Sequence, residues 1–378
     1  MSAIGGIIQQ NSNQADACLL SSMSRSLILR GRDGRFAYLN GGVGIFYNRS
    51  QIEEPLSEAQ PLIRPQERGT CSAVVDGWFD PADDAAQHLL DAYQKKGSAC
   101  VEELRGSFAA AICDEARGEA LLLRDRQGSR PLYYTVDQGR LLFASEIKAL
   151  LRSATGDVCV SRDLVRAHIL APVGTYAGEA LYQGICSLPL AHAGLYSRLG
   201  LSLFPLESAA DPTENEELLG TPAPFICPDK DTLRRILTEV LFAFDYPQFD
   251  HLMPAFLQTL SLQAAIPTTR QLSIEDPLLW SSIPYSVERA DRLSRGFSTH
   301  ARPVIPRNWS LSTKAIRRFA QILSELYGEL DAHRTRYLFG DGFSEQIECQ
   351  RNLGKRIRMM GMLYQTLLWE EHYPIRWV

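Results

Sequence analysis

The stretch of sequence that decides the fold is LRDRQGSRPLYY, residues 123–134. Apolar residues stand at both of its ends, and its middle holds Gly128 and Pro131, two residue types that favour tight turns. This pattern predicts a strand, a tight turn and a second strand. Similar apolar runs recur on both sides of it, and they predict strands at 3–8, 43–47, 72–75, 108–113, 120–123, 132–136 and 141–144.

Two stretches with helical periodicity are interleaved with these strands. Leu89, Leu90 and Tyr93 fall on one side of a helix predicted at 85–95, and a second helix is predicted at 163–170. We therefore expect a first domain, residues 1–204, in which helices cover sheets.

The second part of the chain has a different pattern. Residues 205–228 are rich in Pro, Glu, Ala and Asp, which predicts an exposed linker. From 229 to 378 the pattern is mainly helical, with apolar residues at helical spacing in 233–241 and 316–326 and an apolar stripe in 357–368. That stripe is typical of a core helix, which we expect to end before Tyr373-Pro374. Gly340-Asp341-Gly342 predicts a turn between helices.

Composition excludes several classes of function. The chain has 378 residues, 22% of them charged, and a formal net charge of -5, so we expect neither nucleic acid nor an anionic membrane surface as a partner. No apolar run approaches the roughly 20 residues that span a bilayer, and the first residues do not resemble a signal peptide. We expect a cytoplasmic protein. The basic cluster Lys355, Arg356 and Arg358 is predicted to lie on a solvated helix face.

The cysteines and histidines give no sign of a metal site. The eight cysteines are scattered, without a C-x-x-C pair or histidines at zinc-ligand spacing. We therefore expect free, mostly buried thiols and no metal or other cofactor.

Several sequence blocks together resemble a known family. They are LRGSFA at 104–109, the stretch 123–134, FASEIKAL at 143–150, RGRDG at 30–34, QPL at 60–62 and LYQGI at 181–185, followed by Leu188-Pro189 and His192. In this order they resemble the amidotransferase half of the glutamine-hydrolysing asparagine synthetases, over about residues 1 to 200. The resemblance implies a class II glutamine amidotransferase domain with the N-terminal-nucleophile fold, an α+β sandwich of four layers (αββα). A smaller, mainly α-helical domain would follow it.

The resemblance also implies a nucleophile at residue 2. In the family, removal of Met1 exposes a cysteine whose thiolate attacks the glutamine amide while its own α-amino group acts as the base. Here Ser2 occupies that position. Serine is small enough to allow removal of Met1, and an N-terminal hydroxyl can serve as a nucleophile. The hydroxyl is nevertheless a poorer nucleophile than a thiolate near neutral pH.

The oxyanion hole implied by the family comes from an Asn-Gly pair, and the matching residues here are Asp76 and Gly77. Aspartate offers an acceptor where a donor must meet developing negative charge. Loss of one such donor costs about 2.7–4 kcal/mol in the barrier. The chain therefore resembles a degenerate copy of the family.

The substrate-binding positions are partly kept. Arg49 occupies the place of the arginine that binds the α-carboxylate in the family, and a guanidinium suits bidentate carboxylate binding. For this arginine a role in fold stability is an equal alternative. The α-ammonium group is met in the family by an aspartate just before a helix, and the alignment places Ala85 there, with Asp84 one residue away.

The second half lacks the S-G-G-x-D-S pyrophosphate loop of asparagine synthetases, so ATP activation of aspartate is not expected. Residues 362–369 resemble the closing helix of some of these enzymes, which suggests a reduced synthetase domain.

Three hypotheses follow. The first, which we favour, is a pseudoenzyme that binds an amino acid such as glutamine or regulates a partner, either another protein or a second copy of the chain. The second is an active amidohydrolase or amidotransferase subunit that uses N-terminal Ser2 together with an amide-forming partner. The third, a complete asparagine synthetase, is disfavoured by the missing loop.

Overall fold

The structure is a computed structural model of the chain. It describes residues 2–10, 14–27, 30–31, 33–50, 60–80, 84–126, 130–153, 158–170, 181–189, 192–206, 229–244, 247, 313–330, 332–373 and 375–378. The chain divides into two compact units, one formed by Met1–Gly156 with Thr175–Pro212 and the other by Asp157–Gly174 with Thr213–Val378. Each unit has its own core and is described by itself.

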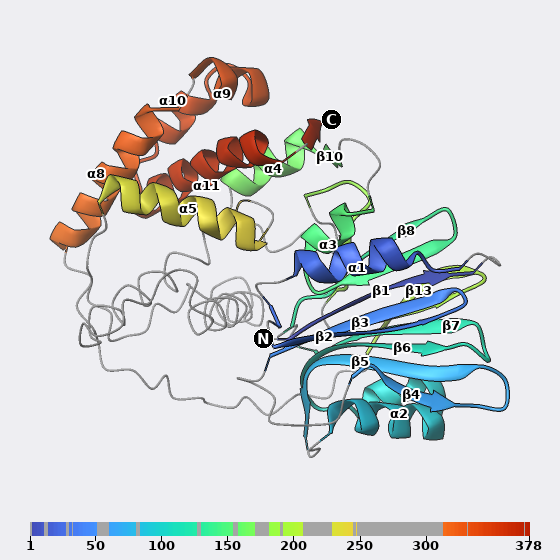
Figure 1. Ribbon diagram of the computed structural model, residues 1–378. Coiled ribbons are helices and arrows are strands. Elements are labelled where there is room, and N and C mark those ends of the chain that lie inside the picture. The colour runs from blue at the N-terminus through green and yellow to red at the C-terminus, as the bar shows by residue number, and fades with distance from the viewer. Residues whose placement is uncertain are drawn as a thin grey trace. The chain divides into compact units, whose positions relative to one another are not determined.

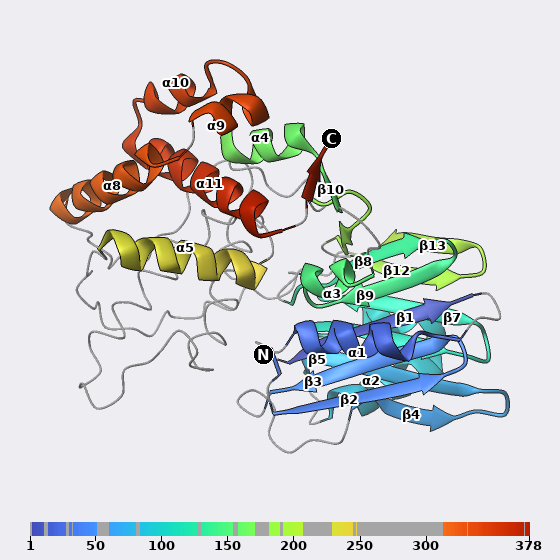
Figure 2. The same ribbon diagram turned by 45° about the horizontal axis from the view of Figure 1, so that its top comes forward.

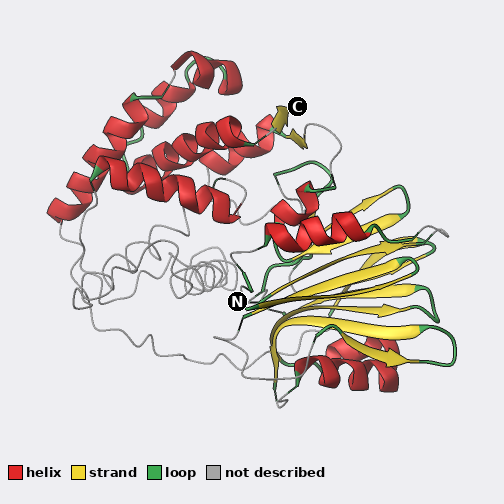
Figure 3. Cartoon of the chain, viewed as in Figure 1, coloured by secondary structure: helices red, strands yellow, loops and turns green. Residues whose placement is uncertain are grey.

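The first unit contains two antiparallel six-stranded sheets (Figure 3). In the first sheet the order is β11 (Cys186–Ser187), β8 (Tyr133–Asp137), β9 (Arg140–Ala144), β1 (Ala3–Gln9), β3 (Val43–Arg49) and β2 (Gly34–Asn40). In the second sheet the order is β13 (Gly200–Pro205), β12 (His192–Ser197), β7 (Glu119–Arg124), β6 (Gly106–Asp114), β5 (Thr70–Phe79) and β4 (Leu62–Pro65). Ala3 pairs with Asn48 and Gly5 with Ala144, which places β1 in the middle of the first sheet.

The two sheets stack on each other and helices cover their outer faces (Figures 1 and 2). Helices α1 (Ala17–Ser26) and α3 (Ile147–Leu151) lie on the first sheet, while α2 (Ala85–Lys96) and the short 3-10 helix η1 (Gly97–Glu102) lie on the second. One buried apolar cluster fills the space between the sheets, and another lies between the second sheet and α2. The first unit therefore has four layers in the order αββα, which confirms the predicted α+β fold class.

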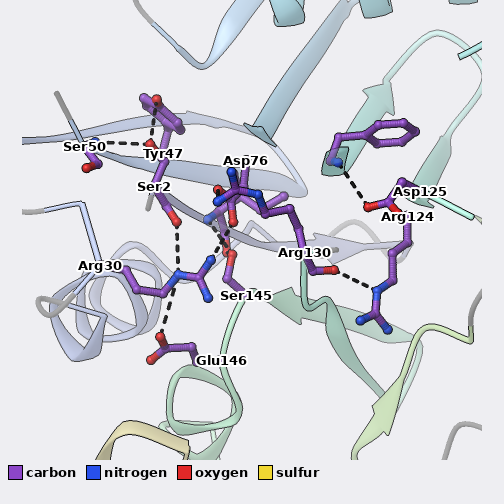
Figure 4. Close-up of polar contacts among 12 residues, drawn as sticks. Ser2, Arg30, Tyr47, Ser50, Asp76, Arg124, Asp125, Arg130, Ser145 and Glu146 are labelled. Carbon is purple, nitrogen blue, oxygen red and sulfur yellow. Dashed lines mark hydrogen bonds and ion pairs between the residues drawn. The ribbon is translucent and has the colours of Figure 1, made fainter. Parts of the chain in front are cut away.

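The stretch 123–134 does not form a hairpin within one sheet. Its flanking strands are β7 and β8 as predicted, but they belong to different sheets, so the stretch crosses between the two layers. Arg124 Nε donates to the Arg130 carbonyl at 2.7 Å, and the Phe108 N–H donates to Asp125 Oδ2 at 3.2 Å (Figure 4). The neighbouring residues Arg124 and Asp125 therefore anchor the crossover at its start. The turn residues 127–129 lie outside the described residues.

The second unit is mainly helical. It comprises α4 (Arg162–Leu170), α5 (Lys230–Phe244), α8 (Thr313–Gly328), α9 (Ala332–Phe339), α10 (Phe343–Glu348) and α11 (Leu353–His372), with β10 (Val158–Val160) parallel to β14 (Ile375–Trp377). Helix α11 contacts α4, α5, α8 and α10, and its residues 359–367 are buried all round. The apolar stripe at 357–368 is thus part of a core helix, which ends before Tyr373-Pro374, as predicted.

Residues 158–170 group with the second unit, although they were predicted to belong to the first domain, residues 1–204. The reason is local: β10 pairs with β14, and Arg358 donates to the carbonyl oxygens of His168 and Ile169 at 2.8 Å each. The prediction of a solvated basic cluster is wrong for Arg358, because its guanidinium binds the last carbonyls of α4. The predicted linker lies outside the described residues from 207 to 228. Among the helices that the structure describes, none is long and apolar enough to cross a membrane.

Candidate functional site

Ser2 precedes β1 directly, and its side chain is completely buried. Its Oγ lies 3.2 Å from the Tyr47 hydroxyl and accepts a hydrogen bond from the Ser50 N–H at 3.1 Å (Figure 4). Tyr47 lies in β3, and Ser50 follows the end of this strand, which pairs with β1 from Ala3 onward. The β1–β3 ladder therefore holds the Ser2 hydroxyl in place, as part of a closed polar layer.

Arg30 joins Ser2 to the second sheet. Its Nε donates to the Ser2 carbonyl at 3.1 Å, and its Nη2 forms an ion pair with Asp76 Oδ2 at 2.8 Å (Figure 4). The same Nε lies 3.7 Å from Glu146 Oε1. Arg30 and Asp76 are 6% and 0% exposed, so this guanidinium and this carboxylate meet away from solvent. The structure thus brings Ser2 and Asp76 together through a residue that links them both.

Asp76 is held between two positive charges. Besides Arg30, Arg130 Nη1 lies 3.7 Å from Asp76 Oδ1, an oxygen that makes no hydrogen bond within the described part of the chain. Two guanidinium groups offset the cost of burying this carboxylate. The arrangement supplies acceptor oxygens here and no side-chain donor from Asp76.

Gly77 is required by the backbone itself. Its φ is +125°, and a Cβ atom there would lie 2.0 Å from the Ser107 carbonyl oxygen on β6. A glycine at this position therefore has a structural explanation that is independent of any oxyanion hole.

The side chains of Arg49 and Asp84 make no hydrogen bond or ion pair with this layer among the described residues. Arg49 ends β3, is partly buried, and its side chain makes no hydrogen bond or ion pair with any described residue. Asp84 caps α2: its Oδ1 accepts the Gln87 N–H at 2.9 Å, while its Oδ2 is buried and has no hydrogen-bond partner among the described residues. Because α2 begins at Ala85, Asp84 itself is the aspartate just before the helix.

Sequence reasoning missed the residues that complete this site. They are Arg30, Tyr47, Ser50, Arg130 and Glu146. Arg30, Arg130 and Glu146 belong to the blocks that carry the family resemblance, but we used those blocks only as evidence of fold. The available signal was the presence of charged side chains inside otherwise apolar or turn-forming blocks, since a buried charge needs a partner of opposite sign.

The buried cysteines do not replace the missing thiolate. Burial raises the pKa of Cys71 to about 12 and that of Cys100 to about 11, and it raises the pKa of Cys113 further still. These thiols are neutral near pH 7 and therefore unreactive. Only three of the seven cysteines in the described residues are buried, fewer than expected, and Cys227 lies outside them. The described residues contain no group of three or more His, Cys, Asp or Glu side chains that could hold a metal ion.

Comparison with known proteins places the first unit in a family. A family model described as a glutamine amidotransferase domain matches residues 79–204. Asparagine synthetase (glutamine-hydrolyzing) 3 of Bacillus subtilis (strain 168) is 37% identical over 117 residues, 31% of this chain and 19% of that protein. Asparagine synthetase B (glutamine-hydrolyzing) of Escherichia coli (strain K12) is 31% identical over 146 residues, 34% of this chain and 26% of that protein. The first unit is an asparagine synthetase-like glutamine amidotransferase domain.

Each match covers only part of this chain and only part of the relative. Asparagine synthetase (glutamine-hydrolyzing) 2 of Bacillus subtilis (strain 168), 29% identical over 168 residues, covers 40% of this chain, and the match spans 22% of that protein. The chain thus matches about a quarter or less of the length of these relatives. The residue range of the family model begins after Asp76 and so does not include Ser2, Arg49 or Asp76.

Solved structures with a similar trace include the glutamine phosphoribosylpyrophosphate amidotransferase from B. subtilis in complex with ADP and GMP. It is 15% identical, with a TM-score of 0.41, over 77% of this chain and 64% of that one.

Proposed function

We propose that this chain is a non-catalytic relative of the glutamine amidotransferases that binds an amino acid or regulates a partner. The observation that carries the proposal is the enclosure of Ser2, whose side chain is 0% exposed and whose Oγ is engaged by Tyr47 and Ser50. A hydroxyl is a poorer nucleophile than a thiolate near neutral pH. An enclosed hydroxyl must in addition be uncovered before it can meet a substrate.

Asp76 supports the same proposal. If it stands where the family has its oxyanion-hole asparagine, the position offers a carboxylate paired with Arg30 at 2.8 Å in place of an amide donor. The missing donor costs about 2.7–4 kcal/mol in the barrier. A weaker nucleophile raises the same barrier again, and each 1.36 kcal/mol is about a tenfold loss of rate.

Ligand binding is the part of the ancestral function that this chain retains in our proposal. Arg49 would bind the α-carboxylate of a small amino acid such as glutamine, since its guanidinium is not committed to any described residue. Asp84 would accept from the α-ammonium group through Oδ2, the oxygen that does not cap α2. A protein partner or a second copy of the chain would then respond to the bound ligand.

The test compares the purified full chain with a Ser2→Ala variant in glutamine. We expect both to release glutamate at the same background rate, while calorimetry detects glutamine binding that Arg49→Gln removes. Glutamate release that exceeds the Ser2→Ala control would reject the proposal. It would favour an active amidohydrolase or amidotransferase subunit instead, and intact-mass measurement should then find Ser2 as the first residue.

A further inference from the structure

Two side chains not engaged in the Ser2 layer lie just beyond it, one on each sheet. Arg49 stands two residues after Tyr47 on β3, and Trp78 stands two residues after Asp76 on β5. Side chains alternate along a strand, so Arg49 faces the same side as Tyr47, which packs in the cluster between the sheets. Arg49 therefore points toward the space between the two sheets.

The same alternation places Trp78 on the inner face of the second sheet. Phe79 packs in the cluster between β5 and α2, on the outer face of the second sheet. Its neighbour Trp78 therefore lies on the inner face, with Val74, which belongs to the cluster between the sheets. Trp78 pairs with Ser107 and Phe79 pairs with Gly106 on β6. The regular pairing therefore continues past Gly77, and the side chains of β5 keep alternating between the two faces.

These two residues form the accessible rim of a closed site. Ser2 and Asp76 are 0% exposed, and Arg30 ties them together across the two sheets. Trp78 is 52% exposed, although it lies on an inner face. Arg49 is partly buried, with a guanidinium that makes no bond to any described residue. The end of the interlayer space thus presents one cation and one large aromatic surface.

We propose that Arg49 and Trp78 form a rim site for an α-amino acid with an apolar side chain. Arg49 binds the carboxylate, and the indole of Trp78 covers the apolar side chain. This inference rests on the proposed amino-acid-binding function and names its ligand class. The carboxamide of glutamine needs polar partners, and the polar groups at Ser2 and Asp76 are enclosed. An apolar side chain needs none and gains by covering exposed aromatic surface.

Calorimetry on the full chain tests this assignment with two probes, L-phenylalanine and L-glutamine. We expect phenylalanine to bind about tenfold or more tightly than glutamine, as expected when one ligand alone fills an apolar contact. Trp78→Ala should remove that advantage and leave the affinity for glutamine within about twofold. Trp78→Phe should keep most of the advantage of phenylalanine over glutamine, because an aromatic ring remains at this position. A loss seen in Trp78→Ala alone is then a loss of the aromatic contact and not of the fold. Leu199→Ala is the matched control, because Leu199 is 98% exposed in the turn between β12 and β13.

The outcomes separate the rim site from the proposed function. If glutamine binds as tightly as phenylalanine, or if Trp78→Ala weakens both equally, the rim site is refuted while amino-acid binding stands. If neither amino acid binds the wild-type chain, the rim site and amino-acid binding both fail, and only the regulatory alternative of the proposed function stands. If Leu199→Ala matches the effect of Trp78→Ala, the change is a general consequence of surface truncation and the rim site is again refuted.

Discussion

Arg30 Nη2 lies 2.8 Å from Asp76 Oδ2, and both side chains are enclosed by the protein. The pair joins the segment after α1 to β5 in the opposite sheet, and so ties the two layers together next to Ser2. A buried ion pair contributes little compared with an apolar pair of the same shape, but removing one partner leaves an uncompensated charge. Asp76 is therefore a structural component on which the contact between the two sheets depends.

This relationship gives a direct stability prediction. Asp76→Ala should lower the free energy of unfolding by about 3–5 kcal/mol, because Arg30 loses its closest buried counter-charge. Urea unfolding of the full chain measures the change. Lys96→Ala is the control, since Lys96 pairs with Glu103 at the surface and such pairs contribute about 0–1 kcal/mol. Equal effects of the two substitutions would mean that the Arg30–Asp76 pair adds nothing through its burial.

Gly77 should tolerate no side chain, whatever the ligand. Gly77→Ala places a Cβ atom 2.0 Å from the Ser107 carbonyl oxygen, so β5 and β6 must separate locally and the variant should be strongly destabilised or fail to fold. Gly139→Ala is the matched control: its φ is also positive, +73°, but nothing lies within 4 Å of the added atom. We expect that variant to lose about 1–2 kcal/mol, the cost of the left-handed backbone alone. Thermal unfolding of both variants distinguishes the clash from the backbone cost.

The sequence predicted the strands and helices whose burial is strongest. Apolar runs such as 108–113 and 120–123 became the central strands β6 and β7 because both faces of those strands are covered. The edge strand β2 was not predicted; it contains the short apolar run 36–39, but its residues are largely exposed, so burial does not impose a pattern on them. Strand order and the sheet to which β8 belongs depend on tertiary pairing and cannot be read from local periodicity.

The candidate site likewise divides into residues predicted from local sequence and residues placed by tertiary contacts. Ser2, Asp76 and Gly77 were found because their positions match a motif, whereas Arg30 and Glu146 were missed because their role is a contact across the sandwich. Charge complementarity inside a core requires knowing which distant segments meet, and one sequence does not contain that information.

Asp84 allows capping and ligand binding to be separated. Asp84→Ala should cost about 0.5–2 kcal/mol, because the Gln87 N–H at the start of α2 loses its acceptor. Asp84→Asn should be nearly neutral in stability, since asparagine caps helices equally well. Both variants should bind an amino acid more weakly than the wild type if Oδ2 meets the α-ammonium group. Unfolding and calorimetry on the same samples check this, and unchanged affinity in Asp84→Asn would limit Asp84 to its role as a cap.

The buried thiols predict how stability changes at alkaline pH. Burial raises the pKa of Cys71 from 9.0 to about 12, so the unfolded chain releases this proton first as the pH rises. The contribution of Cys71 to stability is complete below pH 9 and is lost as the pH rises from 9 toward 12. Between pH 8 and pH 10.5 the wild-type chain should therefore lose more stability than Cys71→Ala, as followed by urea midpoints. Parallel losses in the two proteins would show that Cys71 does not ionise on unfolding in this range.

Restoring sulfur to residue 2 should not by itself restore catalysis. Ser2→Cys supplies the better nucleophile, but in our proposal Asp76 occupies the oxyanion-hole position with a carboxylate, and one missing donor costs about 10²–10³ in rate. Enclosure adds to this, because the residue 2 side chain is held between Tyr47 and Ser50 and is itself 0% exposed. We expect Ser2→Cys to release glutamate from glutamine no faster than Ser2→Ala, as measured by coupled assay under reducing conditions. A clear rate for Ser2→Cys alone would mean that the layer opens readily and that the nucleophile was the single defect.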